Sequence, residues 1–559
     1  MLGLNQVNFL WKKREKNLKN ENPTGFQGYL KVKRISNHLL TEGFQVKRSI
    51  PQRLSDRKRQ ILDRLAEANG SAKYERAFLG APPVLQATGM QYELSDKTRG
   101  IAHGGAPLFL RLAKECGLVD SIDRNLHLLK MHVPYHESDH VMNFALNALC
   151  DGECLQDIEL RRNDESYLNA LGTASIPDPT TAADFCRRFQ PGDITRLNTA
   201  IDEARLNVWR QQPAEFFEEA VIDSDGTIVE TYGECKEGMD ISYDSRWGFH
   251  PLLVTLANTG EVLRLVNRSG NRPSHEGAAA MADECVDLCR QAGFRRIRLR
   301  GDTDFSQTTH LDRWHANGVV FSFGMDASPK LRALAEDLPE SAWKKLQRPA
   351  KYAVKTVPRG RKRNIKRTII RQREFLHLEL KSEQVAEFNY RPVACTRDYR
   401  MIVIRKNISQ EKGDKVLFDQ IRYFFYISND DGKTSTEVVF DCNDRCNQEN
   451  QIAQLSGGVG ALQAPVDNLV SNWAYMLMTS LAWTLKAWAA LLVPVNNGCV
   501  QQHTEEKGKL LRMEFKTFVN AFIRIPCQIV RQAGRRIVRV LNWNPYLPAF
   551  FRLAAVLKC

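Results

Sequence analysis

Two short stretches in which a pair of aspartates interrupts or ends a run of apolar residues constrain the fold of this chain more than any other feature. In residues 221–229, Asp223 and Asp225 stand among β-branched and apolar side chains. In residues 296–306, Asp302 and Asp304 follow a strand-like run. Because a strand has a period of two, both acids of the first pair face one side of it. Acids at the carboxyl ends of strands are typical of the sites of open α/β sheets.

The residues between the two acid pairs predict how these strands are connected. Residues 248–256 and 261–266 are strand-like, and they flank a turn whose Asn258 and Gly260 accept positive φ. A helix is predicted from about 275 to 292, with Gly293 as its end. A further helix after Asp302 and a strand at 319–324 complete the order strand, strand, strand, helix, strand, helix, strand. This order predicts an α/β protein with an RNase H-like core, whose chemistry needs a third carboxylate from a later helix.

The third carboxylate is predicted to be Glu449. Residues 437–440 resemble a strand, and residues 441–443 are predicted to cap a helix that runs from 445 to 455. Arg445, Glu449 and Ile452 share one face of that helix, so burial of Ile452 against the sheet would bring Glu449 beside the aspartates. A surface pair of Arg and Glu has the same spacing. The position of this pair after two acid-ended strands favours a site.

Three clustered carboxylates predict a metal site. Without a cation they would repel one another and be costly to bury. Two Mg²⁺ ions would relieve that cost, one activating the attacking oxygen and the other stabilising the leaving oxygen of a phosphoryl displacement. Asp-rich structural turns are the alternative interpretation.

The balance of charge indicates a polyanionic partner. The chain of 559 residues has a formal net charge of +14 and a pI near 9.1. Such a surface favours DNA, RNA or an anionic membrane, although a solvated charged surface has the same composition. The 13 cysteines are scattered and include no CxxC pair, which favours a reducing cytosol over disulfides or zinc.

Basic segments mark candidate contacts with phosphates. The first hundred residues are predicted to be a basic arm, either tracking phosphates or merely solvated, with a short helix at 54–66. Residues 351–373 contain ten basic residues and no acid, within a predicted β-rich insertion whose strands are 374–380, 399–405 and 420–428. A basic loop there suits the backbone of a duplex, with a solvated hairpin as the alternative. The candidate DNA-binding residues of this segment are Arg361, Lys362, Arg363, Lys366 and Arg367.

Two other regions are predicted to be helical. Residues 103–219 have apolar residues at spacings of three and four through seven predicted helices, which suggests a bundle that positions a substrate. Ser138 and Asp178 are predicted to be N-terminal caps of two of these helices. Residues 469–485 are uncharged and nearly long enough to span a bilayer, but polar residues at both ends favour a core helix. A second basic region beyond residue 512 is predicted either to bind DNA or to form a solvated helix face.

Three motifs around the acids resemble those of DDE transposases of the IS4-like superfamily. They are Asp225-Gly226-Thr227, Arg300-Gly301-Asp302-Thr303-Asp304-Phe305 and Asp444-Arg445-Cys446-Asn447-Gln448-Glu449-Asn450. Two more segments, 267–274 and 465–469, resemble the IS1380 family of bacterial insertion sequences specifically. The resemblance runs from about residue 103 to 553.

The resemblance implies that Asp225, Asp302 and Glu449 are the catalytic and metal-binding triad. Asp225 is preferred to Asp223 because the family pattern places Thr two residues after the catalytic Asp. It also implies that the segment between Asp302 and Glu449 is a β-rich insertion, and that Arg445 contacts phosphate.

The chain departs from the related Y-R-E-K signature. Cys442 and Ser456 stand where that signature has Tyr and Lys, so only Arg445 and Glu449 carry over. The DNA-end contacts of the missing pair are therefore not expected in the same form.

The function implied is cut-and-paste transposition. The enzyme would bind terminal inverted repeats in double-stranded DNA, cut the element ends with Mg²⁺ or Mn²⁺, and join the 3′-hydroxyls to target DNA as a homodimer. We expect a cytoplasmic, nucleoid-associated bacterial protein with no membrane partner. Alternatives are a nuclease that cuts without joining and a non-catalytic DNA-binding protein.

The predicted domain boundaries follow from these motifs. They are a basic arm at 1–100, a helical DNA-positioning domain at 101–220, the first half of the core at 221–325, the β-rich insertion at 326–436, the second half of the core at 437–530 and a basic tail at 531–559.

Overall fold

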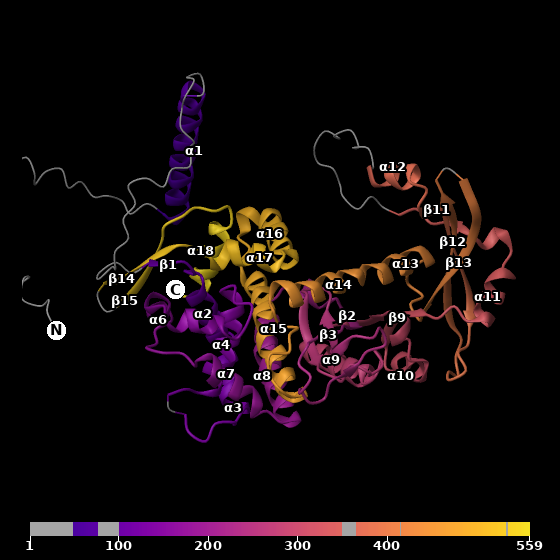
Figure 1. The fold of residues 1–559 in the computed structure, drawn as a ribbon, viewed down its shortest axis with the longest axis horizontal. Coiled ribbons are helices and arrows are strands. Elements are labelled where there is room, and N and C mark those ends of the chain that lie inside the picture. Colours follow the sequence, from indigo (N-terminus) through magenta and orange to yellow (C-terminus); the bar gives the residue numbers. More distant parts are fainter. Residues whose placement is uncertain are drawn as a thin grey trace, which may run out of the picture. The chain divides into compact units, whose positions relative to one another are not determined.

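The computed structural model describes residues 49–75, 100–132, 134–348, 365–413, 415–532 and 535–558. The chain divides into two compact units, Met1–Pro82 and Pro83–Cys559. The described part of the first unit is one helix, α1 (Ile50–Glu75), which confirms and lengthens the helix predicted at 54–66 (Figure 1). The rest of the predicted basic arm up to residue 99 lies outside the described residues.

A nine-stranded sheet forms the centre of the second unit, and five of its strands surround the candidate site. These are β2 (Glu219–Gly226), β6 (Leu252–Leu256), β7 (Glu261–Val266), β8 (Arg296–Gly301) and β9 (Val319–Met325), in the spatial order β9-β8-β2-β6-β7. The strands β2, β6 and β7 are antiparallel neighbours, whereas β8 is parallel to both β2 and β9. The carboxyl ends of β2, β8 and β9 therefore lie at one edge of the sheet.

The connections of these strands confirm the sequence prediction. The hairpin β6–β7 turns through Gly260, which has a φ of 75°. Helix α9 (Ala278–Ala292) ends at Gly293, whose φ of 100° is easily adopted only by a residue without a Cβ. Short 3₁₀ turns and α10 (Leu311–Ala316) then lead from β8 into β9.

The β-rich insertion extends the same sheet. Its long strands are β11 (Leu376–Tyr390), β12 (Tyr399–Lys412) and β13 (Lys415–Ser428), and β13 pairs with β9 through Phe425 and Met325. The three predicted strands are confirmed, although each is longer than predicted. The short strand β10 (Lys344–Lys345) completes the sheet beyond β11, after helix α11 (Pro329–Glu336).

The strand predicted at 437–440 is wrong, because these residues lie in helix α13 (Ser435–Asp444). Thr434 and Glu437 form a capping box at its start, a signal that overrides the β-branched Val438 and Val439. Both valines are buried in a cluster with Val385 and other residues of the insertion, so their apolar run is explained by helix packing. The helix α14 (Cys446–Ala453) follows directly, and the cap predicted at 441–443 is inside α13.

A group of helices packs beside β7, at the end of the sheet opposite the insertion. The seven predicted helices are confirmed as α2 (Ala106–Glu115), α3 (Leu118–Asn125), α4 (Glu137–Leu149), α5 (Asp157–Arg162), α6 (Glu165–Leu171), α7 (Pro179–Arg187) and α8 (Pro191–Trp209). Asp178 caps α7 as predicted, by accepting from the N–H groups of Thr180 and Thr181. At α4 the cap is His136 with Asp139, rather than the predicted Ser138.

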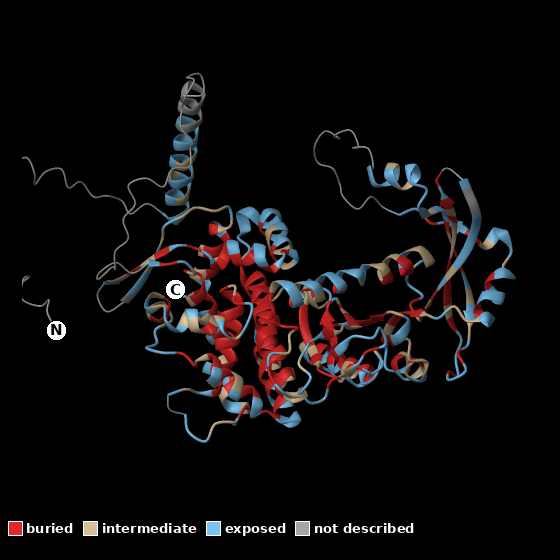
Figure 2. Ribbon diagram, in the orientation of Figure 1, coloured by how far each residue is buried: buried red, intermediate tan, exposed pale blue. Residues whose placement is uncertain are grey.

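Helix α15 (Leu469–Leu492) is the core helix that the sequence predicts. It contacts α4 and β7 and is buried along nearly all of its length, as the red ribbon in Figure 2 shows. Among the described helices, none is by itself long and apolar enough to cross a membrane. Helix α15 and the bent segment that follows, Asn497–Arg512, pass that test of length and composition only as a pair that meets at 100°.

One buried carboxylate connects the helices to the sheet. Glu261, at the start of β7, is fully buried and accepts from Arg205, Trp209 and Trp488 at 2.7 to 3.1 Å. These donors lie on α8 and α15. Because a buried carboxylate needs several donors to offset its lost hydration, this contact holds both helices in a defined position on β7.

The chain beyond residue 530 is folded rather than a tail. Strands β14 (Cys527–Gln532) and β15 (Arg535–Val540) form a hairpin that pairs with β1 (Gly100–Ile101), and α18 (Leu547–Val556) follows. Leu547, Phe550 and Leu553 bury the apolar face of α18.

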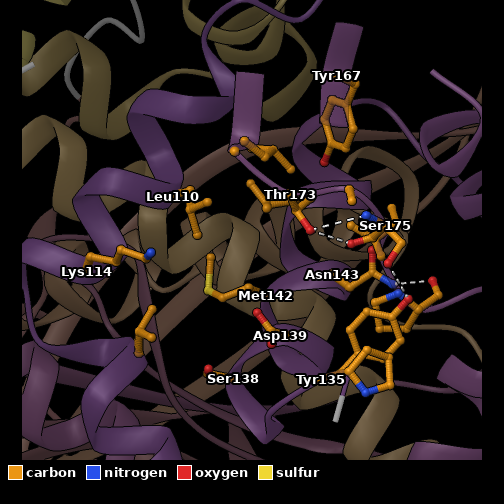
Figure 3. Close-up of a pocket in the computed structure, with 18 residues that line it drawn as sticks. Leu110, Lys114, Tyr135, Ser138, Asp139, Met142, Asn143, Tyr167, Thr173 and Ser175 are labelled. Carbon is orange, nitrogen blue, oxygen red and sulfur yellow. Dashed lines mark hydrogen bonds between the residues drawn. The ribbon is translucent and has the colours of Figure 1, made fainter. Parts of the chain in front are cut away.

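A cavity of about 460 Å³ lies among the helices, away from the acid motifs. Its walls come from α2, α4, α6 and residues 172–177, and Figure 3 shows Lys114, Asp139 and Tyr135 around it. The Tyr135 hydroxyl and Ser175 Oγ are 3.1 Å apart at its margin. The lining mixes apolar and polar groups and includes none of the candidate catalytic residues.

Candidate active site

Three carboxylates from three separate elements surround the guanidinium of Arg445. Asp225 comes from the end of β2, Asp302 directly follows β8, and Glu449 lies in the first turn of α14. Arg445 Nη1 is 2.9 Å from Asp225 Oδ2, while Nη2 is 4.0 Å from Asp302 Oδ2 and 3.8 Å from Glu449 Oε1. The structure therefore brings together all four residues that the sequence analysis placed in one site.

The site is open on one side, and its charges do not balance. The side chains of Asp225 and Arg445 are each 14% exposed, compared with 38% for Asp302 and 61% for Glu449. Burial raises the pKa of Asp225 to about 6, and the nearby Asp302 adds to this rise against the opposing effect of Arg445. Burial likewise raises the pKa of Asp302. A single guanidinium thus offsets only part of the cost of placing three acids here.

Burial alone would lower the pKa of Arg445, but Asp225, Asp302 and Glu449 together hold it above its ordinary value. This cation is therefore charged at every physiological pH and is the natural partner of the acids when no other cation is present.

The close packing behind Asp225 explains the glycine that follows it. A Cβ on Gly226 would stand 2.8 Å from Nε2 of His250, so only glycine leaves room for that ring. The ring is buried, and its Nδ1 lies 2.8 Å from the carbonyl oxygen of Arg272. The motif Asp225-Gly226-Thr227 therefore has two roles: its glycine allows β2 to pack against His250, and its aspartate is a candidate catalytic acid.

Asp302 is oriented by the turn that it begins. Its Oδ1 accepts from the N–H of Asp304 at 3.0 Å, which caps the 3₁₀ turn Thr303–Phe305. Asp304 itself is exposed. A Cβ on Gly301 would stand 2.5 Å from the Cβ of Phe305, so the strand and the turn pack tightly.

Helix α14 is held by amide groups that the sequence analysis missed. Gln448 Nε2 donates to the carbonyl oxygens of Asp223 and Leu253, and both Gln448 and Gln451 are buried. Ile452, which we expected to bury this helix, is only half-buried. Polar residues on this face of the helix gave no periodic apolar signal, so the face is identified only by the two sheet carbonyl oxygens that accept from Gln448.

Asp223 belongs to a separate, closed cluster. Its two oxygens accept from Arg300 at 2.7 and 2.8 Å, and only 2% of its side chain is exposed. Arg300 also contacts Asp441 at 3.1 Å, and Arg298 pairs with Asp430 at 2.6 Å. We define the closed cluster as Glu219, Asp223, Asp430 and Asp441 with Arg296, Arg298, Arg300 and Lys433.

We define the open cluster as Asp225, Asp302 and Glu449 with Arg445. The carboxylate oxygens of the open cluster are hard donors that suit a divalent cation such as Mg²⁺. In the described part of the chain, no three acid, histidine or cysteine side chains stand close enough to hold an ion with their present spacing. In the open cluster the place between the acids is taken by Arg445.

A cavity of about 370 Å³ adjoins the open cluster. Asp302 and Arg445 form part of its wall, and aromatic residues of β13, including Tyr423 and Tyr426, form another. Burial raises the pKa of Tyr426 to about 12, so its hydroxyl is neutral at physiological pH. The site is thus bounded by the insertion as well as by the acid-ended strands.

The structure describes only some of the basic residues that were predicted to bind DNA. Arg361, Lys362 and Arg363 lie outside the described residues. Lys366 and Arg367 are on the helix α12 (Ile365–Gln372) rather than on a loop, and Arg367 pairs with Glu379. In the second basic region, Lys516 pairs with Glu153 and Arg524 with Asp151, so part of that positive charge is neutralised within the chain.

Comparison with known proteins identifies one family over most of the chain. Residues 98–559 match the model described as Transposase DDE domain group 1. A search of curated proteins finds no match. Among solved structures, the piggyBac transposase synaptic complex with hairpin DNA is similar with a TM-score of 0.32 and 11% identity, over 76% of this chain and 82% of that chain. Because the family match covers far more than half of the chain, this protein belongs to the DDE transposases, group 1, and is an enzyme of that type.

Proposed function

We propose that the chain is a cut-and-paste transposase with an RNase H-like core, in which Asp225, Asp302 and Glu449 are the catalytic acids. The observation that carries this proposal is the convergence of these three acids, from β2, the end of β8 and α14, on Arg445. The strand order β9-β8-β2-β6-β7, in which β6 alone runs antiparallel to the other four strands, supports the core assignment.

The geometry supports Asp225 over Asp223 as the first acid. Asp223 is buried with both oxygens bound to Arg300, whereas Asp225 faces the open cluster. A group whose lone pairs are already used by a buried guanidinium would have to break that pair before it could bind anything else.

The donor set of the open cluster fits one or two divalent cations, and we propose Mg²⁺, with Mn²⁺ able to substitute. Asp225 and Asp302 would hold or bridge the ions and Glu449 would complete the set. The bound ions would supply an activated oxygen nucleophile and stabilise the leaving oxygen. Arg445, which already touches all three acids, would then be free to contact a phosphate of the DNA.

We further propose that the substrates are the terminal inverted repeats of an insertion sequence of the IS1380 family and its target DNA. Two protomers would hold the two ends, and the helical and inserted regions would position the duplex. Lys366, which is exposed on α12, is a candidate phosphate contact, together with Arg361, Lys362, Arg363 and Arg367 of the same basic segment. In this proposal the enzyme works in the bacterial cytoplasm, at the nucleoid.

Cleavage of a labelled duplex carrying the terminal repeat tests the proposal. We expect Mg²⁺- or Mn²⁺-dependent nicking at the repeat boundary by the wild type, and none by Asp225→Asn, Asp302→Asn or Glu449→Gln. Asp304→Asn, which changes an exposed acid two residues from Asp302, is the matched control and should still cut.

Two further outcomes separate the alternative functions. Supplying pre-cleaved ends with target DNA distinguishes joining from cutting, since a nuclease gives no joined product. A wild type that binds the repeat but never cuts with either metal would favour the non-catalytic DNA-binding protein.

A further inference from the structure

A small three-stranded sheet with an unusually exposed apolar surface lies immediately after Asp225 in the chain. It consists of β3 (Val229–Glu230), β4 (Asp240–Ile241) and β5 (Trp247–Phe249), in the order β3-β5-β4. Its large exposed side chains are Tyr232 (89% exposed), Tyr243 (84%), Ile241 (58%) and Trp247 (36%). We call residues 229–249 the aromatic sheet.

Backbone pairing orders the strands and the turn of the aromatic sheet, and the Trp247 side chain has a hydrogen-bond partner. Ile241 and Trp247 are directly opposite each other on β4 and β5, so they share one face. The Trp247 indole N–H donates to the carbonyl oxygen of Gly233, next to Tyr232, at 3.4 Å. Tyr243 lies in the tight turn 242–246, which is closed by the hydrogen bond from Ser242 N–H to the Arg246 carbonyl oxygen at 2.8 Å.

Two contacts link Tyr243 to the first catalytic acid of the proposed site. The ring centroids of Tyr243 and His250 are 6.4 Å apart. The His250 ring in turn packs against Gly226, the residue that follows Asp225. An exposed aromatic side chain is therefore positioned beside the edge of the sheet where the acids lie.

The segment 267–274, whose sequence the catalytic site does not explain, supports the aromatic sheet. Arg268 and His250 exchange backbone and side-chain hydrogen bonds at 2.8 and 3.0 Å, and Ser269 forms a β-bridge with Phe249. Asn271 Nδ2 donates to Asp240 Oδ2 at 2.6 Å. A Cβ on Gly270 would stand 2.3 Å from the carbonyl oxygen of Asp240, so the two backbones touch.

The segment 465–469 supports the same sheet from another side. The Glu237 N–H donates to the carbonyl oxygen of Asp467 at 2.8 Å. Gly238 has a φ of 80°, and a Cβ there would stand 2.7 Å from the Cβ of Leu469. Asn267 Nδ2 donates to the carbonyl oxygen of Leu469 at 3.0 Å, which connects the two supporting segments to each other. Both segments thus hold the aromatic sheet against the core.

The charge of the aromatic sheet limits what it can bind. Residues 229–249 contain five acids and two basic residues, in a chain whose net charge is +14. Such a surface does not attract phosphates, so the aromatic rings are the groups through which it could bind a ligand. Exposed apolar side chains on a rigidly supported surface next to a site mark an interaction surface.

We propose that the aromatic sheet is a stacking platform for unpaired nucleobases of the DNA end beside the cut, with Tyr243 and Trp247 as its principal contacts. The proposal rests on the proposed transposase function, because that function brings DNA to Asp225. Base faces are uncharged and stack on aromatic rings whatever their sequence, whereas the acids of the sheet keep the sugar-phosphate backbone turned away. Tyr243 and Trp247 are positioning residues in this scheme.

Photocrosslinking of the full-length chain tests the platform without depending on activity. The probe is a repeat duplex in which the two terminal base pairs are mismatched and 5-iododeoxyuridine is placed, one position at a time, near the boundary. The cleavage-deficient variant Asp302→Asn binds this probe, and the complex is then irradiated. We expect crosslinks from the bases next to the boundary to the peptide containing Tyr243 and Trp247. Crosslinks from those bases only to other parts of the chain would overturn the proposal.

Substitutions give a second, quantitative readout. Tyr243→Leu and Trp247→Leu should weaken binding of the mismatched end by about fivefold or more each, because loss of one stacked ring has an effect of this size. Tyr243→Phe and Trp247→Phe, which keep a ring, are the matched controls and should bind like the wild type. Binding of the fully paired repeat interior should not change with any of the four.

Failures of the two proposals are distinguishable. If the wild type cuts at the repeat but the leucine variants bind mismatched ends as tightly as the wild type does, the platform is wrong and the transposase assignment stands. If the wild type neither binds nor cuts the repeat, both are wrong. A change in oligomeric state on Tyr243→Leu, with mismatched-end binding unchanged, would show that the surface contacts a second copy of the chain and would overturn the platform.

Discussion

The closed and open clusters lie at neighbouring positions of the same sheet and are both built from acidic and basic side chains, yet they differ in charge balance. The closed cluster sets four acids against four basic residues, and Asp223 and Arg298 within it are almost fully buried. The open cluster sets three acids against Arg445 and exposes Asp302 and Glu449.

The difference shows which acids are structural and which are available for chemistry. In the closed cluster every carboxylate has a guanidinium or ammonium partner, so its electrostatic cost is largely offset within the chain. In the open cluster Arg445 is the one basic side chain among the described residues that pairs with the three acids, and a cation from solution would stabilise the surplus of negative charge. A single residue separates Asp223 from Asp225 in the sequence, but the two acids belong to opposite kinds of site.

The largest expected effect is on catalysis by the open cluster. Asp225→Asn and Asp302→Asn should each lower metal-dependent cleavage by about a thousandfold or more, as is usual when one member of a group that acts together is removed. Both variants should unfold at the same temperature as the wild type or higher, since each removes a repelling charge. Cleavage assays and thermal unfolding measure the two effects, and a variant that loses both activity and stability would contradict the distinction between the clusters.

The next largest effect is on stability through the closed cluster. Asp223→Ala leaves Arg300 buried with half of its partners missing, so we expect the free energy of unfolding to fall by about 3–5 kcal/mol. Urea denaturation followed by circular dichroism measures this change. The matched control, Asp225→Ala, should cost far less, and equal losses in the two variants would remove the basis of the comparison.

A smaller effect is expected in the dependence of stability on pH. The folded pKa of Asp225 is about 6, above the ordinary value of 3.8, so the folded chain holds more protons than the unfolded chain between these values. Stability from this group is present below pH about 4 and is lost as pH rises through about 6, by up to about 3 kcal/mol.

The test is to compare unfolding of the wild type and Asp225→Asn from pH 4 to 7 in a chelator. The difference between them should grow in favour of the variant as pH rises, and Mg²⁺ should reduce it. If the wild type instead gains stability relative to the variant over this range, the stabilisation of the Asp225 carboxylate by Arg445 outweighs the cost of burying that carboxylate.

A still smaller change in stability is expected at Lys486, a buried cation that contacts an uncharged carbonyl group and an aromatic ring. The Lys486 ammonium is 1% exposed, donates to the carbonyl oxygen of Leu511 at 2.8 Å and lies over the Trp483 ring. Burial lowers its pKa to about 7. The unfolded chain therefore holds the extra proton between about pH 7 and 10.5, and stability rises with pH over that range.

Lys486→Met should consequently raise the free energy of unfolding by about 1 kcal/mol at pH 7, by replacing a buried charge with an apolar chain of similar length. The gain should shrink toward pH 10. Lys516→Met, at an exposed lysine paired with Glu153, is the control and should have little effect. If Lys486→Met instead loses stability at pH 7, the hydrogen bond to Leu511 contributes more to stability than burial of the charge costs.

Local sequence patterns were sufficient to predict the elements with strong periodic signals and the residues of the open cluster. Period-two patterns predicted β2 and β8, apolar spacing predicted α2 to α9, and Asp178 and Gly293 identified helix ends. Local spacing could not identify residues 437–440, because β-branched valines favour a strand until the capping box of Thr434 and Glu437 is considered. Ile452 was likewise expected to bury α14, where the sheet instead binds Gln448.

The role of each charged residue depends on contacts that form only in the folded chain. Asp223 and Asp225 share one face of one strand and are equivalent in any local pattern; they differ because Arg300 is directly opposite Asp223 in the parallel register with β8, whereas Asp225 meets Arg445 from α14. The aromatic sheet and its supports at 267–274 and 465–469 are also invisible locally, because they meet only in the folded chain. Electrostatic and packing energies depend on distances between residues far apart in sequence, and those distances are set by the fold.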